Sequence, residues 1–234
     1  MTGTFINVAT ILAGTLIGTL VGNRLPPGIH DRVLAGLGLV TMVLGVDLAL
    51  AWRDTSALYV LGGVLLGGLV GEGLRVEDRM ASLGDRLQRW SARGDEHSTV
   101  SEAFFTASLL FCVGPLAVVG SLQDGLTGNY EPLATKALLD GFASIAIAAS
   151  LGSGVAFAAL SVFVVQGSLT LTAGLFEHAL AQGSEALAAL TSAGGVLIIG
   201  ISLKLLEIKD VRVGNFLPAL VIAPALVGVV SLVR

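Results

Sequence analysis

Ile11–Leu25 reads ILAGTLIGTLVGNRL and Val60–Leu74 reads VLGGVLLGGLVGEGL, and these two stretches decide the fold. They match at eight of fifteen positions, and both carry glycine at every fourth residue. Glycines four residues apart lie on one face of a helix and let a neighbouring backbone approach closely. The residues between them are mostly apolar, as hydrocarbon requires. We therefore predict two tightly packed transmembrane helices.

The composition extends this interpretation to the whole chain of 234 residues. Apolar residues make up 54% and charged residues 13% of it, whereas a soluble domain is roughly one quarter charged. The net charge of −4 and the lack of a basic tract argue against a nucleic-acid partner. The single cysteine, Cys112, excludes an intramolecular disulfide.

Eight apolar stretches approach or reach the roughly 17–25 residues that a helical crossing needs. Lipid offers no partner for bare backbone groups, so each stretch must be helical. The first has no preceding basic residue and is expected to be a retained span, not a signal peptide. The fold class is all-α, a polytopic bundle forming one integral membrane domain over residues 1–234. The predicted spans are Thr4–Val21, Val33–Ala51, Ala57–Gly73, Ala103–Leu122, Leu133–Leu151, Gly154–Leu175, Leu190–Leu206 and Phe216–Val233.

The distribution of lysine and arginine predicts an orientation in the membrane. With eight spans, ten of these residues lie on one side and three on the other. The positive-inside rule then places both termini outside the cytoplasm. The fifth and sixth spans are separated only by 152–154. If they form one long broken helix, seven crossings remain and the termini lie on opposite sides.

One sizeable polar segment, residues 75–97, connects the third and fourth spans. Its apolar residues recur at spacings of three and four, as on one face of a helix. We expect an amphipathic helix on the cytoplasmic lipid surface. The alternative is a partner-binding coiled coil.

Similarities between distant spans suggest internal repetition. Weaker matches than the opening pair link the second span with the seventh and the third with the eighth. If spans 1–3 repeat as spans 6–8, a shift of five crossings reverses their direction. Such inverted repeats are common in secondary transporters, whose substrates bind at the repeat interface. The alternative is that glycine-rich segments resemble one another by chance.

Lys136 and Asp140 lie four residues apart at the start of the fifth span, on one helix face. A charge in hydrocarbon costs at least ~2.5 kcal/mol, so each needs a partner, a water path or a function. The two residues either form a structural ion pair or provide a site where Asp140 binds a coupling cation, a proton or sodium.

Prolines interrupt two spans. Pro115 follows Gly114 near the middle of the fourth, and Pro218 lies near the start of the eighth. Proline removes a backbone hydrogen bond and clashes with the preceding turn. The pattern favours a kinked helix over a discontinuous one, although the carbonyls of a discontinuous helix can ligate an ion.

Four other polar residues lie in or beside spans. Asn7 lies in the first, Gln166 in the middle of the sixth, Asn215 at the start of the eighth and Asp124 at the exit of the fourth. Asn and Gln usually join helices, at about 0.6 kcal/mol per bond. The alternative is that they orient a substrate.

Known catalytic patterns are missing from the sequence. The histidines are isolated, and no nucleophile–base pairing, phosphate loop or zinc motif occurs. We therefore expect no enzyme activity, no cofactor and no metal site.

Four stretches in order resemble the bacterial YdfK/YqgA family: Gly114–Leu126 (GPLAVVGSLQDGL), Lys136–Gly141 (KALLDG), Gln166–Thr170 (QGSLT) and Asn215–Leu220 (NFLPAL). The resemblance runs nearly end to end and is loose only in the polar connection. The family is catalogued as a domain of unknown function (554) in the inner membrane. The resemblance therefore implies a multi-span membrane protein but supplies no substrate.

These features predict a secondary transporter of a small solute or ion. The alternatives are an oligomeric ion channel and a non-transporting scaffold acting through the 75–97 helix. The expected partners are membrane lipid, a coupling cation (proton or sodium) and further copies of the chain. The predicted binding residues are Asn7, Gly114, Pro115, Asp124, Lys136, Asp140, Gln166, Asn215 and Pro218.

Overall fold

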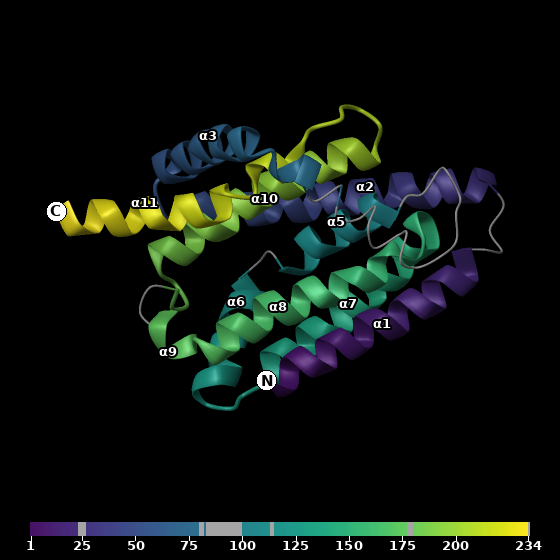
Figure 1. Cartoon of the computed structure of the whole chain (residues 1–234), viewed down its shortest axis with the longest axis horizontal. Coiled ribbons are helices and arrows are strands. Elements are labelled where there is room, and N and C mark those ends of the chain that lie inside the picture. The colour runs from purple at the N-terminus through teal and green to yellow at the C-terminus, as the bar shows by residue number, and fades with distance from the viewer. Residues whose placement is uncertain (23–26, 80–81, 83–99, 113–114, 177–179, 234) are drawn as a thin grey trace. The chain divides into compact units, whose positions relative to one another are not determined.

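The computed structural model describes residues 1–22, 27–79, 82, 100–112, 115–176 and 180–233, and the regular structure in these ranges is helical (Figure 1). Within these ranges, seven helices are long and apolar enough to cross a membrane, or eight if one bent pair of helices counts as a span. The all-α transmembrane fold is thus confirmed. The chain forms two compact units. Unit 1 comprises 1–37, 80–112 and 116–174, and unit 2 comprises 38–79, 113–115 and 175–234.

Unit 1 is organised around its first helix, which packs along the fifth predicted span and against the sixth (Figure 1). Its elements are α1 (Thr2–Gly22), α5 (Val100–Cys112), α6 (Pro115–Leu126), α7 (Glu131–Leu151), the 3₁₀ turn η2 (Ser153–Phe157) and α8 (Ala158–Leu171), followed by the short α9 (Ala173–Phe176), which straddles the unit boundary.

The glycine ladder of α1 faces α7. A Cβ on Gly14, Gly18 or Gly22 would collide with a backbone carbonyl oxygen of α7. The predicted close approach is therefore confirmed here. The glycines also set the register between α1 and α7. Gly14 meets Gly141 and Gly18 meets Ile145, so each contact lies one turn further along both helices.

The contacts between α1 and α7 also bear on the number of crossings. Their residue numbers rise together, so the two helices are parallel. Parallel helices that cross a membrane must be separated by an odd number of crossings. The second and third spans supply two, and α5 with α6 supplies the third. With α5 and α6 taken as one crossing, the described residues contain eight candidate spans, which is consistent with the parallel arrangement of α1 and α7.

The fourth predicted span, Ala103–Leu122, is sharply bent. It consists of α5 and α6, which are bent by 61° at the break between them. Pro115 is the first residue of α6, where its missing N–H costs no helical hydrogen bond. The prediction of a kinked rather than a discontinuous helix concerns residues 113–114, which include Gly114 and lie outside the described residues.

The fifth and sixth spans are two separate helices. Gly152 follows α7 with a φ of 85°, a conformation that glycine adopts at no steric cost. The chain then turns through η2 into α8, and both α7 and α8 contact α1. The alternative of one long broken helix was wrong.

Unit 2 contains the end of the second predicted span, the third and the last two. Its elements are α2 (Pro27–Ala49, in this unit from Gly38 on), η1 (Leu50–Asp54), α3 (Ala57–Leu74), α10 (Glu185–Leu205), η3 (Val213–Phe216) and α11 (Ala219–Val233). The seventh span starts five residues earlier than the predicted Leu190, because Ser184 caps α10 by accepting a hydrogen bond from Leu187 N–H.

The second glycine ladder joins α3 to η3 and α11. Gly63 meets Ala223, Gly67 meets Ala219 and Gly71 meets the backbone of Asn215, so the two chains run antiparallel. The large side chains on the opposite faces, such as Leu58 and Leu69, are exposed, as lipid contact requires.

The predicted amphipathic helix over 75–97 lies mostly outside the described residues. Within it, 76–79 are helical and follow a left-handed turn at Arg75.

Candidate functional site

A buried ion pair lies between α1 and α7 in unit 1. Lys136 Nζ contacts Asp140 Oδ2 one turn further along α7, and both side chains are less than one tenth exposed. Asn7 Nδ2 of α1 donates a hydrogen bond of 2.9 Å to the same carboxylate oxygen. The structure thus brings together three of the predicted residues. Their charges cancel, which reduces the cost of burying them in a membrane-spanning bundle.

Neighbouring groups hold this pair in place. The ring of Phe111 in α5 has its centroid 5.9 Å from Lys136 Nζ, within range of a cation–π interaction. Ser144 donates a hydrogen bond of 2.7 Å to the backbone carbonyl of Asp140. The contact of Gly14 with Gly141 and Ser144 brings the α1 backbone against this part of α7.

Several polar atoms of unit 1 are buried without a hydrogen-bond partner in the described part of the chain. In unit 1, α1 and α8 contribute five of them: Thr4 Oγ1, Asn7 Oδ1, Gln166 Oε1, Gln166 Nε2 and Thr170 Oγ1. Asn7 and Gln166 are fully buried. An unpaired polar group in an apolar interior costs about 1–3 kcal/mol. Such a concentration is unusual in a helix bundle that serves only for packing.

The packing of α8 on α1 places Gln166 at the level of the N-terminal turns of α1. Phe163 packs against Phe5 with ring centroids 5.9 Å apart. A Cβ on Gly167 would lie 3.0 Å from Met1 Cε. Gln166 lies between these two contact points in sequence. Gln166 therefore lies at the level of the first turn of α1, and Asn7 lies further along that helix.

Asp124 has a separate structural role at the start of α1. Its Oδ2 accepts a hydrogen bond of 3.1 Å from Gly3 N–H and lies 3.0 Å from the amino group of Met1. The first N–H groups of a helix have no partner within it and favour negative charge. The carboxylate of Asp124 thus provides a hydrogen-bond acceptor and a negative charge at the N-terminal end of α1.

Asn215 and Pro218 lie in unit 2, in a polar cluster of their own at the end of α3. Asn215 Nδ2 donates to Glu72 Oε2 at 2.6 Å, and its Oδ1 accepts from Glu77 N–H at 2.9 Å. Gly214 N–H donates to Glu77 Oε2 at 3.1 Å. Pro218 lies in the turn between η3 and α11, within the candidate span Val213–Ser231.

The Glu77 carboxyl carries a testable pH dependence. Burial raises its pKa, and the hydrogen bond from Gly214 and the charges of Lys204 and Arg212 only partly offset this. The folded state therefore holds this proton to higher pH than the unfolded state. Stability should fall as pH rises from the ordinary glutamate pKa through the raised one.

We expect Glu77→Gln to remove this loss, because a glutamine oxygen still accepts from Gly214 but carries no charge. The variant should unfold at higher temperature than the wild type above that pH window and match it below. Thermal unfolding from pH 4 to pH 8 measures the difference. Asp78→Asn, at the next and more exposed position, is the control. An unchanged pH profile in Glu77→Gln would contradict the assignment.

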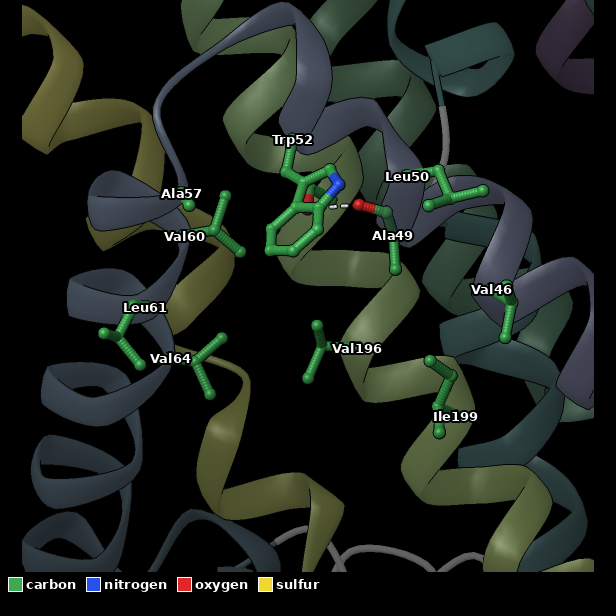
Figure 2. A pocket seen from close by; sticks show the side chains of 11 residues that line it. Val46, Ala49, Leu50, Trp52, Ala57, Val60, Leu61, Val64, Val196 and Ile199 are labelled. Carbon is green, nitrogen blue, oxygen red and sulfur yellow. Dashed lines mark hydrogen bonds between the residues drawn. The ribbon is translucent and has the colours of Figure 1, made fainter.

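An apolar groove of about 340 Å³ lies in unit 2 between η1, α3 and α10 (Figure 2). Trp52 lies between Val60 and Val64 of α3 on one side and Val196 of α10 on the other (Figure 2). The groove lining includes the polar residue Ser192, whose hydroxyl donates a hydrogen bond of 2.7 Å to the backbone carbonyl of Ala49. This lining suits acyl chains and offers no ligand set for an ion.

Sequence reasoning missed two residues of these clusters. Thr4 lies three residues before Asn7, and that spacing on one helix face was the available signal. Glu77 lies in the polar connection between the third and fourth spans. Acidic residues are common there, and no sequence pattern distinguishes Glu77 from the others. The described residues contain no group of three or more His, Cys, Asp or Glu side chains that could hold a metal ion.

Comparisons with known proteins agree with this architecture. A family model described as "Protein of unknown function (DUF554)" matches residues 2–228. The chain is 33% identical over 232 residues to the "Uncharacterized membrane protein YdfK" of Bacillus subtilis (strain 168), covering 98% of this chain and 97% of that protein. It is 28% identical over 224 residues to the "Uncharacterized protein YqgA" of Escherichia coli (strain K12), covering 94% of each. No solved structure matches the chain.

Proposed function

Because this chain belongs to the DUF554 family, whose description assigns no activity, we propose a function from the buried site: a secondary transporter that couples a small solute or ion to a cation bound at Asp140. The chain is a multi-pass membrane protein. The observation that carries the proposal is the buried Asp140–Lys136–Asn7 cluster, in which Asn7 Oδ1 has no hydrogen-bond partner.

The energetic cost of this cluster supports a functional role. Apolar side chains would fill the same volume without burying charge, and such replacements are often neutral or stabilising. Ionisable residues within membrane spans mark ion and substrate pathways by default. The unpaired atoms of Asn7 and Gln166 add a further cost that a bound ligand would offset.

The irregularities of the fourth and eighth spans are a second line of support. The fourth span bends by 61° between α5 and α6, and the eighth passes from η3 through a turn into α11. Transporters commonly build their sites from discontinuous helices, whose free backbone groups bind ions and substrates.

The pairing of helices within each unit fits an inverted repeat of spans 1–3 and 6–8. In unit 1, α1 packs antiparallel to α8, and in unit 2, α3 packs antiparallel to α11. Gly45 of α2 contacts α10, and Gly195 of α10 contacts α2, so these two helices also pack antiparallel. Each of spans 1–3 thus contacts the span that would be its counterpart among spans 6–8. This is the arrangement expected of two repeats related by a twofold axis. We place the transporter in the inner membrane, as the resemblance to the YdfK/YqgA family implies.

Uptake into proteoliposomes tests the proposal. Purified protein is reconstituted, and a panel of small labelled solutes is supplied under an imposed sodium or proton gradient. We expect gradient-driven uptake of at least one solute class. Asp140→Asn should abolish it, because the neutral amide cannot hold a cation against hydration.

Asp47→Asn is the matched control, because it removes one carboxylate from the exposed surface of another span. Equal uptake in wild type and Asp140→Asn, with both proteins folded by circular dichroism, would contradict the role of Asp140. Unitary currents in planar bilayers would identify an ion channel instead of a carrier.

A further inference from the structure

We infer that the apolar groove of unit 2 binds a phospholipid, with one acyl chain between α3 and α10 and the headgroup at Arg53 and Asp54. The groove residues and both charged residues belong to unit 2, whereas the Lys136–Asp140 pair belongs to unit 1. The inference therefore goes beyond the proposed transport function and does not depend on it.

The groove begins at the end of a span and follows the helices inward. Its α3 wall runs from Ala57, the first residue of that helix and of the third candidate span, to Val64. This stretch rises about 10 Å along the helix axis. The α10 wall consists of Ser192, Val196 and Ile199, which share one helix face. Val64 and Val196 lie on opposite sides of the groove (Figure 2). A lipid chain likewise starts near the membrane surface and extends toward the bilayer centre.

The groove is accessible and its lining suits hydrocarbon. Leu50, Leu61 and Val196 line it, and each is more than one third exposed. The hydroxyl of Ser192 is already bonded to the backbone of Ala49 and needs no partner from a ligand. The volume of about 340 Å³ lies at the lower end of the range for ligand pockets, about 300–1,000 Å³. Acyl chains surround every membrane-spanning bundle, so a chain is the apolar ligand that such a groove meets first.

Trp52 and the two charged residues that follow it mark the headgroup end of the groove. Trp52 lines the groove and is 47% exposed. Tryptophan is enriched where a membrane meets water, because its ring is apolar and its N–H is polar. Arg53 and Asp54 end η1 and are exposed. None of the ion pairs found among the described residues involves either of them, so both charges are open to a ligand.

The two opposite charges match a zwitterionic headgroup with an amine, as in phosphatidylethanolamine. The Arg53 guanidinium presents paired N–H donors to phosphate oxygens, and the Asp54 carboxylate accepts from the ammonium group. A headgroup with net negative charge would leave Asp54 beside a second negative group. The groove itself does not select among lipids, because all their chains are similarly apolar. Selectivity therefore has to come from these two charges.

Photocrosslinking tests where the chain lies. Purified full-length protein, washed free of bound lipid in detergent, receives phosphatidylethanolamine with a diazirine in one acyl chain, and mass spectrometry identifies the labelled peptides. We expect labelling of 57–64 and 192–199 well above that of the outward-facing Leu69, which is 72% exposed. Val196→Phe should fill the groove and remove this labelling. Val221→Phe, at an exposed residue of α11 outside the groove, is the matched control and should leave it unchanged.

Competition with unlabelled lipids tests the headgroup. Phosphatidylethanolamine should displace the probe about tenfold better than phosphatidylglycerol or diacylglycerol, since a charge-assisted contact accounts for about one factor of ten. Arg53→Gln should abolish this preference. Arg32→Gln, which removes an exposed arginine from the start of α2, should retain it.

The labelling pattern and the competition both use the wild type, so they test the inference even if a variant fails to fold. Equal labelling of the groove and of Leu69, or labelling that survives Val196→Phe, would indicate ordinary lipid contact and overturn the site. Equal displacement by the three lipids would overturn the role of Arg53 and Asp54. Crosslinks between two copies of the chain through 57–64, with no lipid labelling there, would assign the groove to a second copy and likewise overturn the inference.

Discussion

Replacing Lys136 with methionine is expected to lower the free energy of unfolding by about 3–5 kcal/mol, because it leaves the buried Asp140 carboxylate without its ionic partner. Asn7 would then provide the remaining hydrogen bond of 2.9 Å to a full negative charge inside a membrane bundle. Loss of helical circular dichroism during titration of dodecyl maltoside micelles with sodium dodecyl sulfate measures the change.

The double variant Lys136→Met/Asp140→Leu provides the decisive comparison. With both charges removed, the site becomes apolar, and most of the lost stability should return. Lys204→Met is the control, since Lys204 and Asp210 are 3.9 Å apart and largely exposed, and such pairs contribute about 0–1 kcal/mol. If the double variant is no more stable than Lys136→Met, the two charges are not coupled as the structure indicates.

Gly71→Ala is expected to destabilise the protein by at least the roughly 1–3 kcal/mol that overpacking usually costs. A Cβ at this position would overlap the carbonyl oxygen of Asn215. The backbone of η3 cannot move away without straining the hydrogen bonds that Asn215 makes with Glu72 and Glu77. The same micelle titration measures the loss.

Gly73→Ala is the matched control, two residues further along α3. A Cβ on Gly73 would have no heavy atom within 4 Å. The substitution should be neutral or stabilising by up to about 1 kcal/mol, because alanine has the higher helix propensity. If the two alanine variants are equally stable, the close contact of α3 with η3 is not a determinant of the fold.

The two variants at α3 also test a feature that both units share. The ladder of Gly14, Gly18 and Gly22 meets α7 in unit 1, and that of Gly63, Gly67 and Gly71 meets η3 and α11 in unit 2. Lipid provides little hydrophobic drive between helices, so close backbone packing has to supply the attraction. The ladders thus act as the main helix–helix contacts of the protein.

Much of the candidate site could be named from the sequence. Lys136 and Asp140 were paired correctly because their spacing of four is a local property of one helix. Asn7 was chosen as a polar residue in an apolar span, but its partner could not be predicted. The bond from Asn7 to Asp140 joins residues 133 positions apart, and no local pattern specifies such a contact.

The bend of the fourth span and the partners of Asn215 show the same limit of prediction from sequence. Proline at 115 marked a weak point in the fourth span, but a kink and a break have the same sequence signal. The 61° bend between α5 and α6 depends on the packing of both helices. Asn215 likewise looked like a companion of Gln166, whereas in the structure it bonds to Glu72 and Glu77 within unit 2.

The amino-acid sequence by itself determined the helical class, the approximate positions of the spans and the faces on which α1 and α3 would pack. These properties follow from the length of apolar runs and the period of the helix, both of which are local. Only the tertiary structure decided that α1 pairs in parallel with α7 and thereby brings Asn7 to Asp140. Glycine faces fit many partners equally well, so the choice among them depends on all the packed helices at once.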